Sequence, residues 1–369
     1  MGAAETIMRA GKLWLDEDDT STYLAGKGAY PGSERGLDTQ EKTVKVLQRN
    51  LAQQLIRNFA NWYMDLGGAG WFSDKKFWDE MAKVNAEESK RWKKPKEYRP
   101  QVAFIFDELS MCYIGGNSAS KKTTAVLLSE TRKQLNRASV PFGHYLAEDI
   151  INKRRASKLN VFAGVFALDN NARAKLRKRA NKAVNIWAWL PGYVDVDNRK
   201  FSTSTVKELT NFDVEVMPKG TMSIAVATPA GLQIGLPNHI KGLVRDIVLL
   251  SPKIQDGDLV LATFNNGKPA IVQRGKDIFC AIPMIDSALI RFASKLAGVH
   301  IYSEKPLTVY RSGKYISIVA HSPDNYSVDL GGNYKVYDVY AQKELGEHSV
   351  LDLQMQTADI KLLRLEKTE

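Results

Sequence analysis

A short apolar run that leads directly into four consecutive carboxylates is the feature that most constrains this chain. Residues 13–19 read Leu-Trp-Leu-Asp-Glu-Asp-Asp. Adjacent like charges repel one another, so four acids at the end of a strand indicate a site, a cation or a substrate that uses them. We therefore expect residues 12–24 to form a strand followed by a loop, with chemistry at the strand's end.

Length and composition predict a globular protein of more than one domain. The chain has 369 residues, of which 44% are hydrophobic and 25% are charged, and this exceeds one ordinary core. No apolar run approaches the roughly 18–20 residues that cross a bilayer. The first ten residues include Glu5 and Arg9 and do not resemble a signal peptide. We expect no membrane partner, and the compartment stays undetermined.

Cysteine and histidine usage predicts neither a metal centre nor a thiol nucleophile. Cys112 and Cys280 lie in apolar stretches, so we expect two buried free thiols. The five histidines are far apart in the sequence, and no metal-binding spacing occurs. The sequence therefore predicts no metal and no other cofactor.

The net charge of +11 makes nucleic acid a candidate partner, because nucleic acid is negatively charged. The basic residues concentrate in two segments, residues 83–96 and 173–182. The first has the composition of a charged linker, and the second predicts a helix with a solvated cationic face. No RNA- or DNA-binding motif accompanies either segment, so we do not expect nucleic-acid binding.

Residues 1–96 predict strand–helix–strand–helix. The pattern from Thr39 to Arg57 is helical, and the segment 38–41 is typical of an N-cap and first turn. Residues 59–65 predict a short buried strand that ends in glycines. A second helix is expected from Ser73, and its inner face is predicted to carry Phe77, Trp78 and Met81. Polar and aromatic residues therefore follow the strands, as they do at the catalytic end of a (β/α)₈ barrel.

Two further regions follow. Residues 97–304 alternate apolar strands with helices, which predicts a doubly wound α/β domain. Its expected strands include 102–107, 159–168, 184–190 and 206–209. From residue 305 only strand and turn patterns occur, so residues 305–369 predict a small antiparallel β domain.

Together these segments resemble the C-terminal two-thirds of β-galactosidase-like glycoside hydrolases. Residues 12–19 resemble the seventh barrel strand of that family, residues 39–57 its seventh helix, and residues 61–72 its eighth strand with an aromatic–Asp–Gly motif. The resemblance implies the last two β/α units of a (β/α)₈ barrel. It also implies a flavodoxin-like or amidotransferase-like domain that forms trimers, and a C-terminal β-sandwich-like domain. The α/β domain has no cysteine where the amidotransferases place their nucleophile.

The resemblance also implies a carbohydrate substrate and its site. Retaining glycosidases use a nucleophilic carboxylate and an acid/base carboxylate about 5 Å apart. The family's nucleophile corresponds to Glu17, with the register among residues 16–19 open. Aromatic rings bind the C–H face of sugars, and the implied substrate-binding residues are Trp62, Asp65, Trp71 and Phe72.

Alternatives to these assignments remain. The acidic run could cap a helix or pair with Arg35 or Arg49, and Trp62 and Asp65 could be residues of a barrel core. If the barrel reading holds, Trp62 is expected beside Glu17, and Asp65 within hydrogen-bonding reach of the acidic strand end.

The chain departs from the family pattern in one respect. The family's acid/base glutamate lies far before the nucleophile, and only sixteen residues precede Glu17. Two β/α units do not close a barrel. We therefore expect residues 1–369 alone to lack glycosidase activity, whether the sequence is truncated, another chain supplies the remaining strands, or the fold is kept without catalysis. The alternative function is a non-catalytic oligomerisation or glycan-interaction protein.

Overall fold

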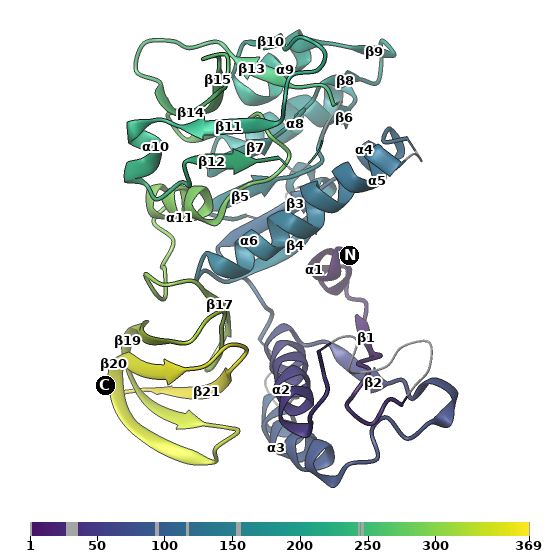
Figure 1. Ribbon diagram of the computed structural model, residues 1–369, viewed down its shortest axis with the longest axis vertical. Helices are drawn as coiled ribbons and strands as arrows, with labels where there is room; N and C mark the ends of the chain where they lie inside the picture. The colour runs from purple at the N-terminus through teal and green to yellow at the C-terminus, as the bar shows by residue number, and fades with distance from the viewer. Residues whose placement is uncertain are drawn as a thin grey trace. The chain divides into compact units, whose positions relative to one another are not determined.

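The computed structural model describes residues 2–26, 36–92, 96–115, 118–152, 156–242, 244 and 247–368 (Figure 1). They fall into two compact units, which are described separately. Unit 1 comprises residues 1–9 and 101–301, and unit 2 comprises residues 10–100 and 302–369. The C-terminal sheet thus belongs with the N-terminal β/α segments. The division into three domains at 96/97 and 304/305 stays a prediction.

The N-terminal half of unit 2 is a parallel strand–helix repeat. Its elements are β1 (Leu15–Asp18), α2 (Gln40–Arg57), β2 (Ala60–Tyr63), the 3₁₀ turn η2 (Leu66–Gly68) and α3 (Lys75–Trp92). Thr39 caps α2 by accepting a hydrogen bond from the Lys42 backbone N–H, as the sequence predicted, and the helix ends at Asn58 in a left-handed conformation. The two β/α units confirm the predicted order of elements in this region.

The C-terminal half of unit 2 is the predicted antiparallel sheet. Its strand order is β17-β18-β21-β19-β20. The strands are β17 (Leu307–Ser312), β18 (Tyr315–Ala320), β19 (Asp324–Asp338), β20 (Lys343–Met355) and β21 (Ile360–Lys367). Along β19 buried and exposed residues alternate, which is the period of a sheet with one face on a core.

Helices α2 and α3 pack on this sheet. Helix α2 lies against β17, β18 and β21. From α3, the buried Glu87 carboxylate accepts hydrogen bonds from Tyr315 Oη (2.7 Å) and Arg364 Nη1 (2.8 Å). An ionised carboxylate and two donors from different strands therefore tie α3 to the sheet.

Unit 1 is a mixed α/β layer around a nine-stranded sheet of order β12-β11-β14-β15-β16-β7-β5-β3-β4. The segment from β4 to β16 is parallel, and the strands from β15 to β12 are antiparallel. Its strands are β3 (Val102–Phe106), β4 (Phe142–Leu146), β5 (Leu159–Phe162), β7 (Val184–Ala188), β11 (Ile224–Ala227), β12 (His239–Lys241), β14 (Leu259–Phe264), β15 (Pro269–Arg274) and β16 (Asp277–Cys280). The central strands β3, β5 and β7 are buried throughout, as strands covered on both faces must be.

The other elements of unit 1 connect or flank this sheet. The helices are α1 (Ala4–Arg9), α4 (Glu108–Cys112), α5 (Ser118–Thr124), the π-helical η3 (Ala125–Glu130), α6 (Thr131–Arg137), α7 (Ala147–Ile151), α8 (Asn170–Ala180), α9 (Thr203–Thr210), α10 (Pro229–Gln233) and α11 (Ser287–Leu296). Two small sheets are formed by β6 (Ala167–Leu168), β8 (Val194–Asp195) and β9 (Lys200–Phe201), and by β10 (Val214–Val216) and β13 (Leu250–Pro252). Helix α1 contacts β4, where the Glu5 carboxylate accepts a hydrogen bond from the His144 backbone N–H (2.6 Å).

A line of buried polar side chains crosses the parallel strands of unit 1. Asn160 Nδ2 donates to Asn185 Oδ1 (2.9 Å), and Asn185 Nδ2 donates to Asp277 Oδ1 (3.0 Å). Asp277 also accepts hydrogen bonds from Trp187 Nε1 (2.8 Å) and Arg177 Nη2 (2.9 Å). The carboxylate is thus the shared acceptor for three side chains, which compensates for its burial.

Some predictions about local structure were wrong. Residues 206–209 lie in helix α9, because Val206 and Leu209 are buried one helical turn apart, a spacing that a four-residue apolar run does not distinguish from a strand. Trp78 is 53% exposed and does not lie on the inner face of α3. Cys112 is an exposed free thiol, whereas Cys280 is buried as predicted.

Two other predictions concerned exposure. Strand β2 was expected to be buried, but its residues are partly buried or exposed. Helix α8 was expected to present its cations to solvent, but Arg173 is only 4% exposed, because Glu208 and the Leu168 carbonyl bind its guanidinium. Arg35 and most of the predicted loop 26–36 lie outside the described residues. Across the described ranges, no helix combines the length and apolar character that a bilayer crossing needs.

Candidate functional site

Strands β1 and β2 bring the acidic run and the aromatic motif together. They pair in parallel, with Leu15 opposite Ala60, Glu17 opposite Trp62 and Asp18 opposite Tyr63. Residues paired across adjacent strands lie about 5 Å apart and project from the same face. Trp62 is therefore the cross-strand neighbour of Glu17, as expected from the sequence.

The two faces of this pair differ in what covers them. Asp18 and Tyr63 project toward the helices: Asp18 contacts Asn50 of α2, and the Tyr63 ring packs on Phe72 and Trp78. The opposite face carries Leu15, which is 55% exposed, together with Glu17 and Trp62, which is 43% exposed. Glu17 and Trp62 therefore share the face that points away from α2 and α3.

The four acids occupy different environments. Asp18 is buried and accepts hydrogen bonds from the Thr20 backbone N–H (3.1 Å), the Thr20 hydroxyl and Asn50 Nδ2 (3.1 Å). Asp16 is partly buried, while Glu17 and Asp19 are exposed. Within the described part of the chain, the Glu17 carboxylate has no hydrogen-bond or ion-pair partner. It is therefore available to a ligand, whereas Asp18 is occupied.

Asp65 organises the loop that follows β2. Its carboxylate accepts hydrogen bonds from the backbone N–H groups of Gly70 (2.8 Å) and Trp71 (3.2 Å). The backbone N–H of the preceding Met64 donates to the Asp18 carbonyl (3.1 Å), and the expectation that the Asp65 carboxylate lies within hydrogen-bonding reach of the acidic strand end stays a prediction. Gly67, Gly68 and Gly70 all have positive φ, so the glycines let the loop fold back onto the carboxylate.

Trp71 and Phe72 are buried. Trp71 is 8% exposed and its carbonyl accepts a hydrogen bond from the Thr22 hydroxyl, while Phe72 is 5% exposed and packs on Tyr63. Their role as substrate-binding residues stays a prediction, and their burial favours a structural role. Of the aromatic residues in the motif, Trp62 offers the most accessible ring.

Asn50 is a site residue that sequence reasoning missed. It lies on α2, donates to Asp18 and accepts hydrogen bonds from Arg49 Nε (3.3 Å) and Nη2 (3.2 Å). Within the described residues Arg49 forms no ion pair with the acidic run, but its charge interacts with that of Asp18, and Asn50 bridges the two side chains. The sequence offered one signal, because Asn50 lies one turn after the buried Leu47 on the helix that follows the acidic run.

The arrangement combines a carboxylate and an aromatic ring that could both contact one ligand. A free carboxylate and an exposed indole lie side by side at the carboxyl ends of two parallel strands. A carboxylate in that position serves as nucleophile or charge stabiliser, and an indole face stacks on a sugar ring. No group of three His, Cys, Asp or Glu side chains suited to a metal ion occurs among the residues described.

Comparison with known proteins gives matches to solved structures. No family model and no curated protein matches the sequence. The β-galactosidase of Bacillus circulans sp. alkalophilus superposes with a TM-score of 0.64 at 11% identity, over 96% of this chain and 55% of that chain. The β-galactosidase of Rahnella sp. R3 gives 0.66 at 14% identity, over 99% and 57%. The α-L-fucosidase isoenzyme 2 of Paenibacillus thiaminolyticus gives 0.58 at 11% identity, over 99% and 62%.

These neighbours define the fold. The chain has the fold of one part of a glycoside hydrolase. More particularly, its fold is similar to that of part of the β-galactosidases, which confirms the resemblance drawn from the sequence, and the chain spans little more than half the length of the β-galactosidases it matches.

Proposed function

We propose that this chain is the C-terminal part of a retaining, β-galactosidase-like glycoside hydrolase, with Glu17 as its nucleophile. In this proposal β1 and β2 are the last two strands of a (β/α)₈ barrel. Trp62 forms one wall of the sugar site, and the substrate is a carbohydrate. The β-galactosidase-like fold supports this function class.

One observation carries the assignment of Glu17. It is the acid of the run that lies directly opposite Trp62, on the face that α2 and α3 leave uncovered. In a complete barrel that face points to the interior, where substrate binds at the carboxyl ends of the strands. Asp18 is excluded as nucleophile by its burial and its three hydrogen bonds.

The acid/base residue is expected outside residues 1–369. The described sheet that contains Glu17 has two strands, and a retaining mechanism needs a second carboxylate about 5 Å away to protonate the leaving group. Residues 1–369 alone should therefore not hydrolyse 4-nitrophenyl β-D-galactopyranoside. Hydrolysis by this polypeptide, lost in Glu17→Gln, would contradict the two-carboxylate reasoning.

The nucleophile is tested in the longest natural protein that contains these residues. There Glu17→Gln should lower kcat by roughly a thousandfold or more, because it keeps the side-chain shape and removes the charge that forms the glycosyl–enzyme bond. Asp19→Asn is the matched control, an exposed acid of the same run, and should keep near-normal turnover. In Glu17→Gly, azide should restore turnover and yield the α-galactosyl azide. Near-normal activity of Glu17→Gln, or no azide product, would refute Glu17 as nucleophile.

The competing function is a non-catalytic protein that assembles subunits or binds glycan. It is favoured by the two-stranded form of the β1–β2 sheet, which leaves Glu17 without a second described carboxylate as its partner. In either function a homo-oligomer is expected, a trimer by resemblance. If the longest natural protein binds galactosides with Trp62-dependent affinity yet never turns them over, this second function replaces the first.

A further inference from the structure

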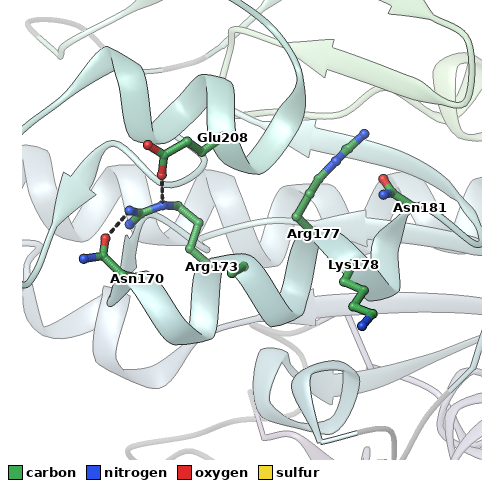
Figure 2. Close-up of a pocket in the computed structure, with 7 residues that line it drawn as sticks. Asn170, Arg173, Arg177, Lys178, Asn181 and Glu208 are labelled. Atoms are coloured by element: carbon green, nitrogen blue, oxygen red, sulfur yellow. Dashed lines mark hydrogen bonds and ion pairs between the residues drawn. The ribbon is translucent and has the colours of Figure 1, made fainter.

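A groove in unit 1 is lined mainly by cationic and amide side chains. It lies in unit 1 between α8 and α9 and has a volume of about 630 Å³. Its lining comes from one face of α8 and from Glu208 of α9, and comprises Asn170, Arg173, Ala174, Arg177, Lys178, Asn181 and Glu208 (Figure 2). The volume is within the usual range for small-molecule sites, about 300–1,000 Å³.

Two guanidinium groups in the groove are held in place by acids. Arg173 Nε donates to Glu208 (2.8 Å), and its Nη2 reaches Asn170, as Figure 2 shows. Arg177 Nη2 donates to Asp277 (2.9 Å) and its Nη1 to the Leu209 carbonyl (3.4 Å). These contacts use only some of the five N–H groups of each guanidinium. Arg173 is only 4% exposed and its Nη1 also binds the Leu168 carbonyl, so the donors open to a ligand are chiefly those of Arg177, whose side chain is 21% exposed and is held in place before any ligand arrives.

Lys178 adds a cation without a partner. Among the described residues it forms no hydrogen bond or ion pair, and it is exposed on α8. The lining therefore contains three cations and one acid, a net charge of +2, or +1 when Asp277 behind Arg177 is included. Ala174 is also part of the lining and is exposed, and its short side chain takes up little of the groove.

Cations near the end of a helix also stabilise its dipole, which is the alternative account of this sequence. That account applies equally to Lys175 and Lys182, which are not among the residues that line the groove. It does not explain why Arg173, in the first turns of α8, is held against Glu208 at the groove wall. The combination of fixed guanidiniums, a free ammonium and an open centre requires a second explanation.

We propose that the α8–α9 groove is a binding site for a phosphorylated small molecule. A phosphate group carries about two negative charges and accepts several hydrogen bonds, so it matches a lining whose free groups are mainly donors. The Asn170 and Asn181 amides at the two ends of the groove are suited to hydroxyl groups of the rest of the ligand. This site is independent of Glu17, so its test does not depend on the proposed glycosidase function.

The test is calorimetric titration of residues 1–369 with galactose 6-phosphate, inorganic pyrophosphate and unmodified galactose. The two phosphorylated probes should bind, more weakly at higher salt, and galactose should not bind at this site. Lys178→Glu should weaken phosphate-probe binding by about tenfold or more. Lys175→Glu, the same charge change on the same helix outside the lining, should change it by less than about twofold.

A second variant separates shape from charge. Ala174→Leu fills the groove without altering charge, and should abolish binding while the far-ultraviolet circular dichroism stays that of the parent. Absence of phosphate-probe binding at 10 mM, about the weakest affinity of interest, would overturn the proposal. Equal weakening by Lys175→Glu and Lys178→Glu would overturn it too, because it would indicate attraction to the whole helix. Tighter binding of a single-stranded RNA with that same equal sensitivity would assign the helix to nucleic acid instead.

Discussion

Replacing Asp277 by alanine should destabilise unit 1 substantially, because this carboxylate is the common acceptor of a buried hydrogen-bond line. It accepts from Trp187 Nε1, Asn185 Nδ2 and Arg177 Nη2. Trp187 has no exposed surface, and Asp277 is its indole's hydrogen-bond acceptor. Asp277→Ala therefore leaves an indole N–H buried without a partner, which costs about 1–3 kcal/mol.

The loss of the Asp277 acceptor costs less at the other two donors, Asn185 and Arg177. Asn185 Nδ2 also donates to the carbonyls of Ala180 (3.0 Å) and Ala183 (3.2 Å), so it remains satisfied. The Arg177 side chain is 21% exposed and can turn to water, so the loss of its ion pair adds about 1 kcal/mol. Together the expected loss in the free energy of unfolding is roughly 3 kcal/mol, a large share of the stability of an ordinary domain.

Hydrogen exchange measured by mass spectrometry reports this loss of unfolding free energy through peptides that belong to unit 1. Peptides from β7 and β16 should exchange roughly 100-fold faster in Asp277→Ala, since each 1.4 kcal/mol is a factor of ten. Asp256→Ala is the control, because Asp256 is exposed and forms no hydrogen bond or ion pair with the described residues, and it should leave exchange unchanged. In the double variant with Trp187→Phe, the removal of Asp277 should cost less, because no indole N–H remains to be orphaned. A loss below about 0.5 kcal/mol for Asp277→Ala would refute the reasoning.

Two further predictions concern unit 2. Burial raises the pKa of Glu87, but hydrogen bonds from Lys90 and Tyr315 and the charge of Arg364 outweigh it and hold the pKa below the ordinary value near 4.5. Glu87 therefore stabilises the folded state above about pH 4.5, and this contribution is lost as the pH falls through its folded-state pKa. In denaturant melts repeated at several pH values, Glu87→Gln should reduce the loss of unfolding free energy between pH 4.5 and more acidic pH. The exposed control Glu344→Gln should leave that loss unchanged. An unchanged loss in Glu87→Gln would contradict the assignment. Thr39→Ala should lower the free energy of unfolding of unit 2 by about 1 kcal/mol, because it removes the N-cap of α2. Thr39→Ser keeps a capping hydroxyl and should change that free energy little. Equal effects of the two substitutions in urea melts would count against capping.

The sequence predicted the order of elements well where their patterns were long. Helix α2 was predicted with both its cap and its end, because eighteen residues repeat one apolar face and both termini carry capping residues. The antiparallel character of the C-terminal sheet also followed from alternation along its strands. Short apolar runs did not predict the type of element correctly. The pattern of residues 206–209 is compatible with a strand and with a helix, and in the structure this segment is helical and packs on α8.

Exposure was predicted less well than secondary structure, because it depends on partners distant in the sequence. Arg173 has the composition of a solvated helix residue, yet Glu208 lies thirty-five positions away and covers it. Likewise the carboxylate of Asp65 binds two backbone N–H groups of its own glycine-rich loop, and no helix or strand pattern predicted that contact. Neither event leaves a periodic signal, so pattern reading does not detect it.

The choice among the four acids shows what strand pairing adds to the sequence. Residues alternate between faces, so Asp16 and Asp18 face the helices, while Glu17 faces away. Burial alone would not separate Glu17 from the exposed Asp19. The register does, because Glu17 is the acid paired with Trp62 inside the strand, whereas Asp19 follows the last residue of β1. A nucleophile must be held on a rigid element to attack within a fraction of an ångström of its target. By that criterion Glu17 is the acid of this run that best fits the proposed nucleophile, and its exposed apolar neighbour Leu15 lies on the face that further strands would cover in the proposed barrel.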